Sequence, residues 1–119
     1  MAETKVKLSA LDPVWTRVRE EAFEMVRAEP LLGGLVHSSL LHHSSLERAL
    51  AYRFSLKLAS GEMSEQILRE IADEAYATDP DLGQAARADV TAVFDRDPAC
   101  LRFIQPILFF KGYQAIQAY

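Results

Sequence analysis

The sequence predicts an all-α fold, a compact bundle of six to eight short helices. Apolar residues recur every three or four positions through most of the chain, as they do on the buried face of a helix. Residues that favour helix starts recur as well: Asp-Pro pairs at 12–13, 79–80 and 97–98, and serines at 44–45 and 64. No segment shows the alternation of apolar and polar residues that is typical of a strand.

The first helix is expected to begin at Asp12-Pro13, because Asp is a good N-cap and Pro fits the first helical position. Its apolar face consists of Val14, Trp15, Val18, Ala22, Met25 and Val26. Glu29-Pro30 should end it, since proline disfavours helical geometry in the residue before it. Residues 1–11 are expected to form a flexible N-terminal segment, and residues 12–119 one helical domain.

The next segment, residues 31–41, is apolar but holds two glycines, which predicts a short helix of low intrinsic propensity. Ser44 is followed three residues later by Glu47, the spacing of a capping box, so a helix should start here. Its apolar residues are Leu50, Phe54 and Leu58. Ser60-Gly61 should end it.

The cleanest apolar stripe of the chain follows Ser64, which can cap the helix that carries it. The stripe consists of Ile67, Leu68, Ile71, Ala72, Ala75 and Tyr76. Asp79-Pro80 should open a fifth helix, and Asp97-Pro98 a further one. Pro106 is expected to divide a short helix from a last one, residues 107–119. That helix reaches Tyr119 without a terminating residue, so we expect the chain to be a fragment, truncated within its last helix.

Composition limits the possible function classes. The 119 residues are 50% hydrophobic and 25% charged, which is ordinary for one folded domain. A net charge of -4 with scattered basic residues argues against a nucleic-acid partner. One cysteine, Cys100, excludes an internal disulfide and favours a reducing compartment. No segment resembles a signal peptide or a membrane span, so we expect a cytoplasmic protein without a membrane partner.

Several segments occur in an order that is typical of one enzyme family. They are the helix around Trp15, Glu29-Pro30-Leu31, residues 37–41, Asp73-Glu74-Ala75-Tyr76-Ala77 followed by Asp79-Pro80, Arg96-Asp97-Pro98-Ala99, and residues 111–119. Each motif is weak alone, but their joint order and spacing are specific. Together they resemble the N-terminal helical domain of bacterial-type serine acetyltransferases over residues 12–119.

The resemblance implies a concrete activity for a parent protein. Family members transfer the acetyl group of acetyl-CoA to L-serine, giving O-acetyl-L-serine and CoA, in the first committed step of cysteine biosynthesis. The acetyl-CoA site and the catalytic histidine lie on a left-handed parallel β-helix that follows the helical domain and is absent here. This chain is therefore expected to bind no cofactor and to be inactive alone.

The resemblance also implies partners. In the family, three β-helices form a trimer, and the helical domains join two trimers into a hexamer. A C-terminal tail, also absent here, docks on cysteine synthase. The alternative reading of the chain is a stand-alone helical domain whose function is self-association without catalysis.

One site residue of the family falls within this chain. Asp97 matches the Asp of the Arg-Asp-Pro motif, which in the family contacts the bound serine and helps to orient the catalytic machinery, and Pro98 shapes the same loop. From the residues alone, Asp97 is better explained as the N-cap of a helix beginning at Pro98, and the resemblance reverses this preference. The two roles are compatible only in part, because a capping side chain has less freedom to meet a substrate.

Other candidate residues have simpler interpretations. His37, His42 and His43 lack the i, i+4 spacing of paired ligands on a helix, so we expect surface or packed histidines and no metal site. Asp89 lies near an apolar stripe and should need a partner, most simply an arginine of a neighbouring helix. Cys100 is expected to be a packed thiol.

A dense apolar patch near the end of the chain has two interpretations. It consists of Phe103, Ile104, Ile107, Leu108, Phe109 and Phe110. Either these side chains belong to the core, or some of them form a contact between subunits. The sequence favours neither.

Overall fold

The computed structural model describes residues 12–109 and 111–119. These residues form helices and connecting loops without a strand, which confirms the predicted all-α class. No helix within the described ranges is long and apolar enough to cross a bilayer. The flexible segment predicted for residues 1–11 lies outside the described residues, as does Phe110.

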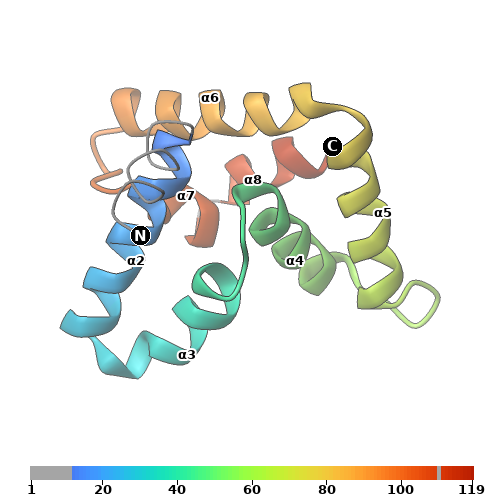
Figure 1. Cartoon of the computed structure of the whole chain (residues 1–119), viewed down its shortest axis with the longest axis horizontal. Coiled ribbons are helices and arrows are strands. Elements are labelled where there is room, and N and C mark those ends of the chain that lie inside the picture. The colour runs from blue at the N-terminus through green and yellow to red at the C-terminus, as the bar shows by residue number, and fades with distance from the viewer. Residues whose placement is uncertain (1–11, 110) are drawn as a thin grey trace, which may run out of the picture.

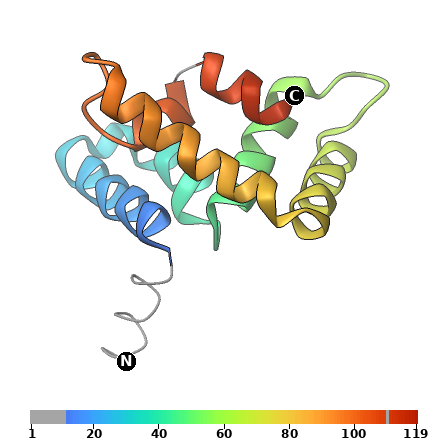
Figure 2. The same cartoon turned by 90° about the horizontal axis from the view of Figure 1, so that it is seen from above.

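The long helix α6 (Pro80–Arg96) lies across the top of the molecule in Figure 1. Below it, α2 (Pro13–Ala28) and α5 (Glu65–Thr78) lie at opposite ends, and α4 (Leu46–Leu58) lies between them. Seen from above, α6 runs diagonally, with α2 on one side and α8 (Lys111–Ala118) on the other (Figure 2).

Three helices begin where the sequence predicts. The N–H of Trp15 donates to Oδ1 of Asp12 at 3.2 Å, which caps α2. The Ser64 hydroxyl caps α5 in the same way, and the Asp79 carboxylate accepts a hydrogen bond from the N–H of Asp81 at the start of α6. These caps join residues two or three positions apart, so local sequence is enough to find them.

The start of α4 differs in detail from the prediction. Ser45, not Ser44, is the N-cap, and its hydroxyl accepts a hydrogen bond from the N–H of Arg48 at 3.2 Å. The predicted capping box of Ser44 and Glu47 is therefore wrong. Glu47 lies at the second helical position, and its side chain forms an ion pair with Arg87 of α6.

Residues 30–41 form one helical segment with three kinds of hydrogen bonding. It begins as the 3₁₀-helix η1 (Pro30–Leu32), continues as α3 (Gly33–Val36) and widens into the π-helix η2 (His37–Leu41). In η2 the N–H of His42 reaches the carbonyl of His37 at 2.8 Å. The predicted short helix is present, and its irregular bonding agrees with its low intrinsic propensity.

The end of the chain corrects two predicted boundaries. Pro106 lies within the first turn of α7 (Ile104–Phe109), where a missing N–H costs no intrahelical hydrogen bond, so it does not divide two helices. Among the described residues, α7 ends at Phe109 and α8 begins at Lys111. No helix begins at Pro98, because residues 97–103 form the loop between α6 and α7.

The core lies where α2, α4, α6, α7 and α8 meet. Its fully buried members include Val18, Leu50, Val90, Ile104 and Ile107. Most of the late apolar patch belongs to this core, because Phe103, Ile104, Ile107 and Leu108 are all buried. Phe109 is 53% exposed, so the core interpretation does not extend to it.

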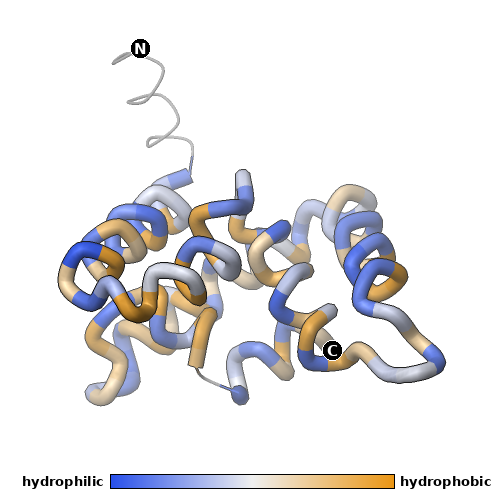
Figure 3. The backbone as a smooth tube through the Cα atoms, turned by 90° about the horizontal axis from the view of Figure 1, so that it is seen from below, coloured by the Kyte–Doolittle hydropathy of each residue, from blue (hydrophilic) through white to orange (hydrophobic). Residues whose placement is uncertain are grey.

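Of the cleanest apolar stripe, Tyr76 packs against the core, but the rest of the stripe lies outside it. No residue of α5 is buried, and Ile67 and Ile71 are 47% and 52% exposed. Figure 3 shows α5 at one edge of the molecule, with hydrophobic and hydrophilic residues alternating along its tube. A cavity of about 460 Å³ lies beside the stripe, with further walls from α4, α6 and the last residues of the chain. We call this cavity, lined by Phe54, Ile71, Leu82, Ile116 and their neighbours, the apolar groove.

Candidate functional site

The candidate site lies in the loop after α6. Asp97 follows the last helical residue and has extended backbone angles of φ -97° and ψ 111°. Pro98 is the reason, because proline disfavours helical geometry in the residue before it. The Asp97 N–H still donates to the carbonyl of Val93 at 2.9 Å, so the last turn of α6 fixes the Asp97 backbone.

The Asp97 carboxylate supports a turn and not a helix. Its Oδ1 accepts a hydrogen bond from the N–H of Ala99 at 2.9 Å, and its backbone carbonyl accepts one from the N–H of Cys100 at 3.0 Å. The interpretation of Asp97 as the N-cap of a following helix is therefore wrong. Among the described contacts, Oδ2 has no hydrogen-bond partner.

Asp97 also lines an open cavity of about 430 Å³ at the end of α6. The walls are Ala92, Val93, Arg96, Asp97 and Pro98. A carboxylate at such a cavity can accept charge-assisted hydrogen bonds from an ammonium group. The arrangement thus offers an anionic binding group whose orientation is set by a backbone turn.

The far end of the loop is held by side chains that the sequence analysis did not single out. Oε1 of Gln105 accepts hydrogen bonds from the N–H groups of Leu101 and Arg102 at 2.6 and 2.9 Å. The carboxylate of Glu21, on α2, accepts hydrogen bonds from the N–H groups of Phe103 and Ile104. A signal for Glu21 exists in the sequence, because it interrupts the apolar stripe of α2 between Val18 and Ala22.

Cys100 is a packed thiol, as predicted. Its side chain is buried, and its Sγ lies 3.3 Å from the carbonyl of Arg102, to which it donates. Burial raises the pKa of the Cys100 thiol above its ordinary value. The thiol is therefore protonated at neutral pH, which disfavours a nucleophilic role.

The three histidines lie at the surface or are packed, as expected. His43 is buried against the Tyr52 ring at 5.0 Å, and its Nε2 is 2.9 Å from the carbonyl of Ser38. Burial lowers the pKa of His43, which favours the neutral imidazole. His37 and His42 are exposed, with ring centroids 6.2 Å apart, because the π-helix between them aligns residues five positions apart. No group of three metal-ligating side chains occurs in residues 12–109 and 111–119.

Asp89 has a partner, but not the predicted one. Its Oδ2 accepts a hydrogen bond from Nε2 of Gln117 at 2.6 Å, which joins α6 to α8. The expected pairing with an arginine is wrong. The nearest arginine in sequence, Arg87, is engaged with Asp12 and Glu47 instead.

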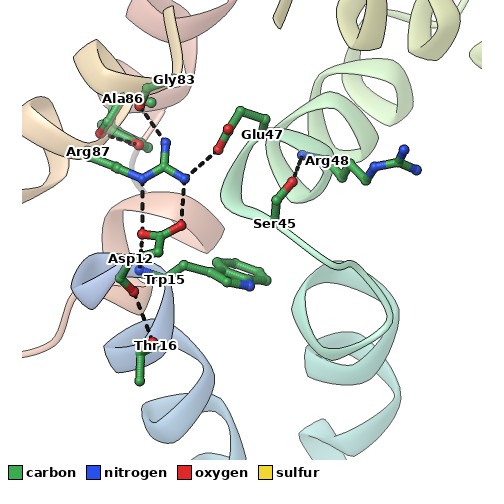
Figure 4. A network of polar contacts seen from close by, with 10 residues as sticks. Asp12, Trp15, Thr16, Ser45, Glu47, Arg48, Gly83, Ala86 and Arg87 are labelled. Atoms are coloured by element: carbon green, nitrogen blue, oxygen red, sulfur yellow. Dashed lines mark hydrogen bonds and ion pairs between the residues drawn. The ribbon is translucent and has the colours of Figure 1, made fainter. Parts of the chain in front are cut away.

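Arg87 is the centre of the polar network in Figure 4. Its Nε and Nη2 donate to the two carboxylate oxygens of Asp12 at 3.1 and 2.8 Å, a bidentate pair. Nη2 also lies 2.7 Å from Oε1 of Glu47, and Nη1 donates to the carbonyl of Gly83. One guanidinium thus joins the first turns of α2 and α4 to α6.

The ionisation of Asp12 reflects this network. Burial alone would raise the pKa of the Asp12 carboxyl, but hydrogen bonds from Arg87 and from the N–H of Trp15 outweigh it and lower that pKa below its usual value. The same contacts raise the pKa of Arg87. Both groups are charged at neutral pH.

The sequence matches one protein family over most of its length, the family described as serine acetyltransferase, N-terminal, over residues 14–118. The chain is 41% identical over 109 residues to the serine acetyltransferase of Salmonella typhimurium. It is 42% identical over 106 residues to that of Haemophilus influenzae. The alignments cover 92% and 89% of this chain but 40% of each relative, so the chain spans 40% of the length of these proteins.

Solved structures have the same fold. Serine acetyltransferase from Brucella abortus in complex with coenzyme A superposes with a TM-score of 0.86 at 39% identity, covering 92% of this chain and 44% of that one. Soybean serine acetyltransferase complexed with serine gives a TM-score of 0.82 at 38% identity, covering 87% of this chain and 43% of that one.

Proposed function

Because this chain belongs to the serine acetyltransferase family and matches its N-terminal domain, we propose that it is the helical part of a serine O-acetyltransferase. The parent enzyme transfers acetyl from acetyl-CoA to L-serine, giving O-acetyl-L-serine and CoA for cysteine biosynthesis. Relatives crystallised with serine and with coenzyme A support this choice of substrates. The coenzyme site and the catalytic histidine belong to the remaining part of the enzyme, so this chain alone has no activity.

The proposed reaction is a direct acyl transfer. The serine hydroxyl attacks the thioester carbonyl carbon while the histidine takes its proton. The carbon–sulfur bond then breaks, and the histidine returns the proton to the CoA thiolate. Asp97 is the part of this machinery that the chain supplies, as a carboxylate that binds the serine ammonium and helps to orient the base.

The observation that carries the proposal is the geometry of Asp97. Its Oδ1 is held by the N–H of Ala99, and the residue lines an open cavity at the end of α6. A carboxylate fixed in this way loses little conformational freedom on binding an ammonium group. Pro98 contributes by keeping Asp97 out of the helix.

Replacement of Asp97 by Asn in the full-length enzyme tests this role. The fold should be kept, because the Asn side-chain oxygen can accept the same hydrogen bond from Ala99. Turnover of serine should fall about a hundred-fold or more, since the charge that binds and orients is lost. Release of the CoA thiol, followed by a colour reaction, measures the rate.

The matched control is Asp95→Asn, which removes an exposed carboxylate two residues earlier in α6. This variant should turn over serine at the wild-type rate. If Asp97→Asn keeps a rate near wild type, the carboxylate has no part in the reaction and serves the turn alone.

The assembly and location of the parent are part of the same proposal. We propose a hexamer, a dimer of trimers joined through the helical domains, in the cytoplasm, where acetyl-CoA is available. A C-terminal tail outside this chain would dock on cysteine synthase. Light scattering on the full-length protein, with and without cysteine synthase, tests both associations.

A second candidate function, self-association of the helical domain itself, is favoured by the apolar groove. Ile67 and Ile71 of α5 and Ile116 of α8 expose about half or more of their side chains, and the last two line the groove. Light scattering on this chain should then give a mass above that of the monomer at high concentration. A clean monomer would contradict it.

A further inference from the structure

We propose that Glu21 is a positioning residue for serine binding, because it fixes the loop that presents the Asp97 carboxylate. The inference rests on the proposed role of Asp97. Glu21 lies on α2, far from Asp97 in the sequence, and it is not among the residues that line the Asp97 cavity. It would therefore act through the loop and not by contact with the substrate.

Glu21 caps α7 from another helix. Its Oε2 accepts a hydrogen bond from the N–H of Phe103 at 3.2 Å, and its Oε1 accepts one from the N–H of Ile104 at the same distance. These N–H groups lie at the start of α7, where a helix offers its first donors no acceptor of its own. A carboxylate at a helix start also interacts favourably with the helix dipole. Glu21 thus fixes the point at which the loop becomes α7.

The surroundings make this anchor rigid. Glu21 is only 9% exposed, and its Oε2 lies 3.5 Å from Nε of Arg17. The Arg17 guanidinium lies over the rings of Phe94 and Phe103, at 4.6 and 4.2 Å from their centroids. The two rings also contact each other at 4.8 Å. The end of the loop is therefore bound to both α2 and α6.

Short contacts connect this anchor to Asp97. The Arg102 carbonyl, next to Phe103, accepts the hydrogen bond of the Cys100 thiol. The N–H of Cys100 in turn donates to the Asp97 carbonyl at 3.0 Å. Loss of Glu21 would leave two buried N–H groups without acceptors, and the loop would have to move to reach water. Asp97 would then lose its fixed orientation.

Serine binding in the full-length enzyme tests the proposal, with the variants Glu21→Ala and Glu21→Gln. In Glu21→Ala the KM for serine should rise about ten-fold, while the KM for acetyl-CoA stays within about two-fold of wild type. Glu21→Gln should lie in between, because the amide keeps one acceptor oxygen. Glu20→Ala, an exposed neighbour on α2, is the matched control and should leave both constants unchanged.

An unchanged KM for serine in Glu21→Ala would overturn the proposal, even if the melting temperature falls, because the role would then be structural alone. An equal rise of both KM values would overturn it too. If Glu21→Ala does not fold, the same criteria apply to Glu21→Gln.

A double variant shows whether Glu21 acts through Asp97. In an Asp97→Asn background, the Glu21→Gln change should have no further effect on serine affinity measured by titration calorimetry. A full additional loss would overturn the proposal. If Asp97→Asn alone leaves turnover unchanged, the proposed role of the Asp97 carboxylate fails, and the positioning role of Glu21 fails with it. If Asp97→Asn abolishes turnover while Glu21 variants bind serine normally, the positioning role alone fails.

Discussion

At the residue scale, Arg87 carries the most concentrated set of polar contacts in the described part of the chain. It pairs with Asp12 and Glu47, two carboxylates from different helices, while its own side chain is only 15% exposed. A buried charge is tolerated when partners replace its water. Removal of the arginine would leave the two carboxylates close together without a cation between them.

Arg87→Met should therefore be strongly destabilising. We expect a loss of about 3 kcal/mol in the free energy of unfolding, because two partly buried carboxylates lose their common partner. For a chain of this size the melting temperature should fall by about 10 °C. Thermal unfolding followed by circular dichroism measures this, with the exposed Arg48→Met of α4 as control. Equal melting temperatures for the two variants would contradict the central role of Arg87.

At the element scale, contacts between helices decide how tightly α4 and α6 pack. Gly83 lies in α6 where a Cβ atom would come 3.0 Å from Cδ of Glu47 and 3.1 Å from Nη1 of Arg87. At Gly112 of α8, no described atom outside its own helix backbone and its two chain neighbours lies within 4 Å of the same position. Alanine substitutions at the two glycines therefore test different effects: helix propensity at Gly112 and close packing at Gly83.

Gly112→Ala should stabilise the chain by about 0.5 kcal/mol, because alanine has the higher helix propensity. Gly83→Ala should destabilise it by about 1 kcal/mol, since Glu47 and Arg87 are held by their ion pair and cannot easily move away. Urea unfolding of both variants measures the opposite signs. A Gly83→Ala variant more stable than wild type would show that these side chains move freely.

The helix starts show what local sequence can predict. Asp12, Ser64 and Asp79 cap α2, α5 and α6 as expected, because each cap joins residues a few positions apart. Asp97-Pro98 has the same pattern but follows a helix instead of starting one. The difference depends on Glu21, Gln105 and the core contacts of Phe103, which place the next helix start at Ile104.

At the scale of the whole molecule, the Arg87 network makes stability depend on pH. The pKa of Asp12 is lower in the folded chain than its ordinary value of 3.8. A carboxylate with a lowered folded pKa adds stability that is complete above the unfolded pKa and is lost as the pH falls through the folded pKa. The network should therefore weaken below about pH 4.

Comparison of wild type with Asp12→Asn across pH tests this. The stability difference between them should be constant above about pH 5 and should shrink as the pH falls below about 4. Asn still caps α2. The stability that Asp12→Asn loses relative to wild type above pH 5 therefore reports mainly the charge pair with Arg87. A pH-independent difference for Asp12→Asn would contradict the linkage.

The candidate site was predicted only through the family resemblance. The motif around Asp97 placed a substrate carboxylate there, but the residues alone favoured a helix cap. Glu21 was not found, because a single acidic residue in an apolar stripe does not reveal which distant N–H groups it meets. Asp89 was given the wrong partner for the same reason.

The sequence by itself determined the helical class, most helix boundaries and the family, because capping and periodicity depend on near neighbours and motifs keep their order. Tertiary structure alone decided that α5 lies at the edge with its stripe exposed, that Arg87 joins three helices, and that Glu21 holds the Asp97 loop. Each of these depends on which distant segments pack together, and such packing follows from the shape of the whole core and not from any local pattern.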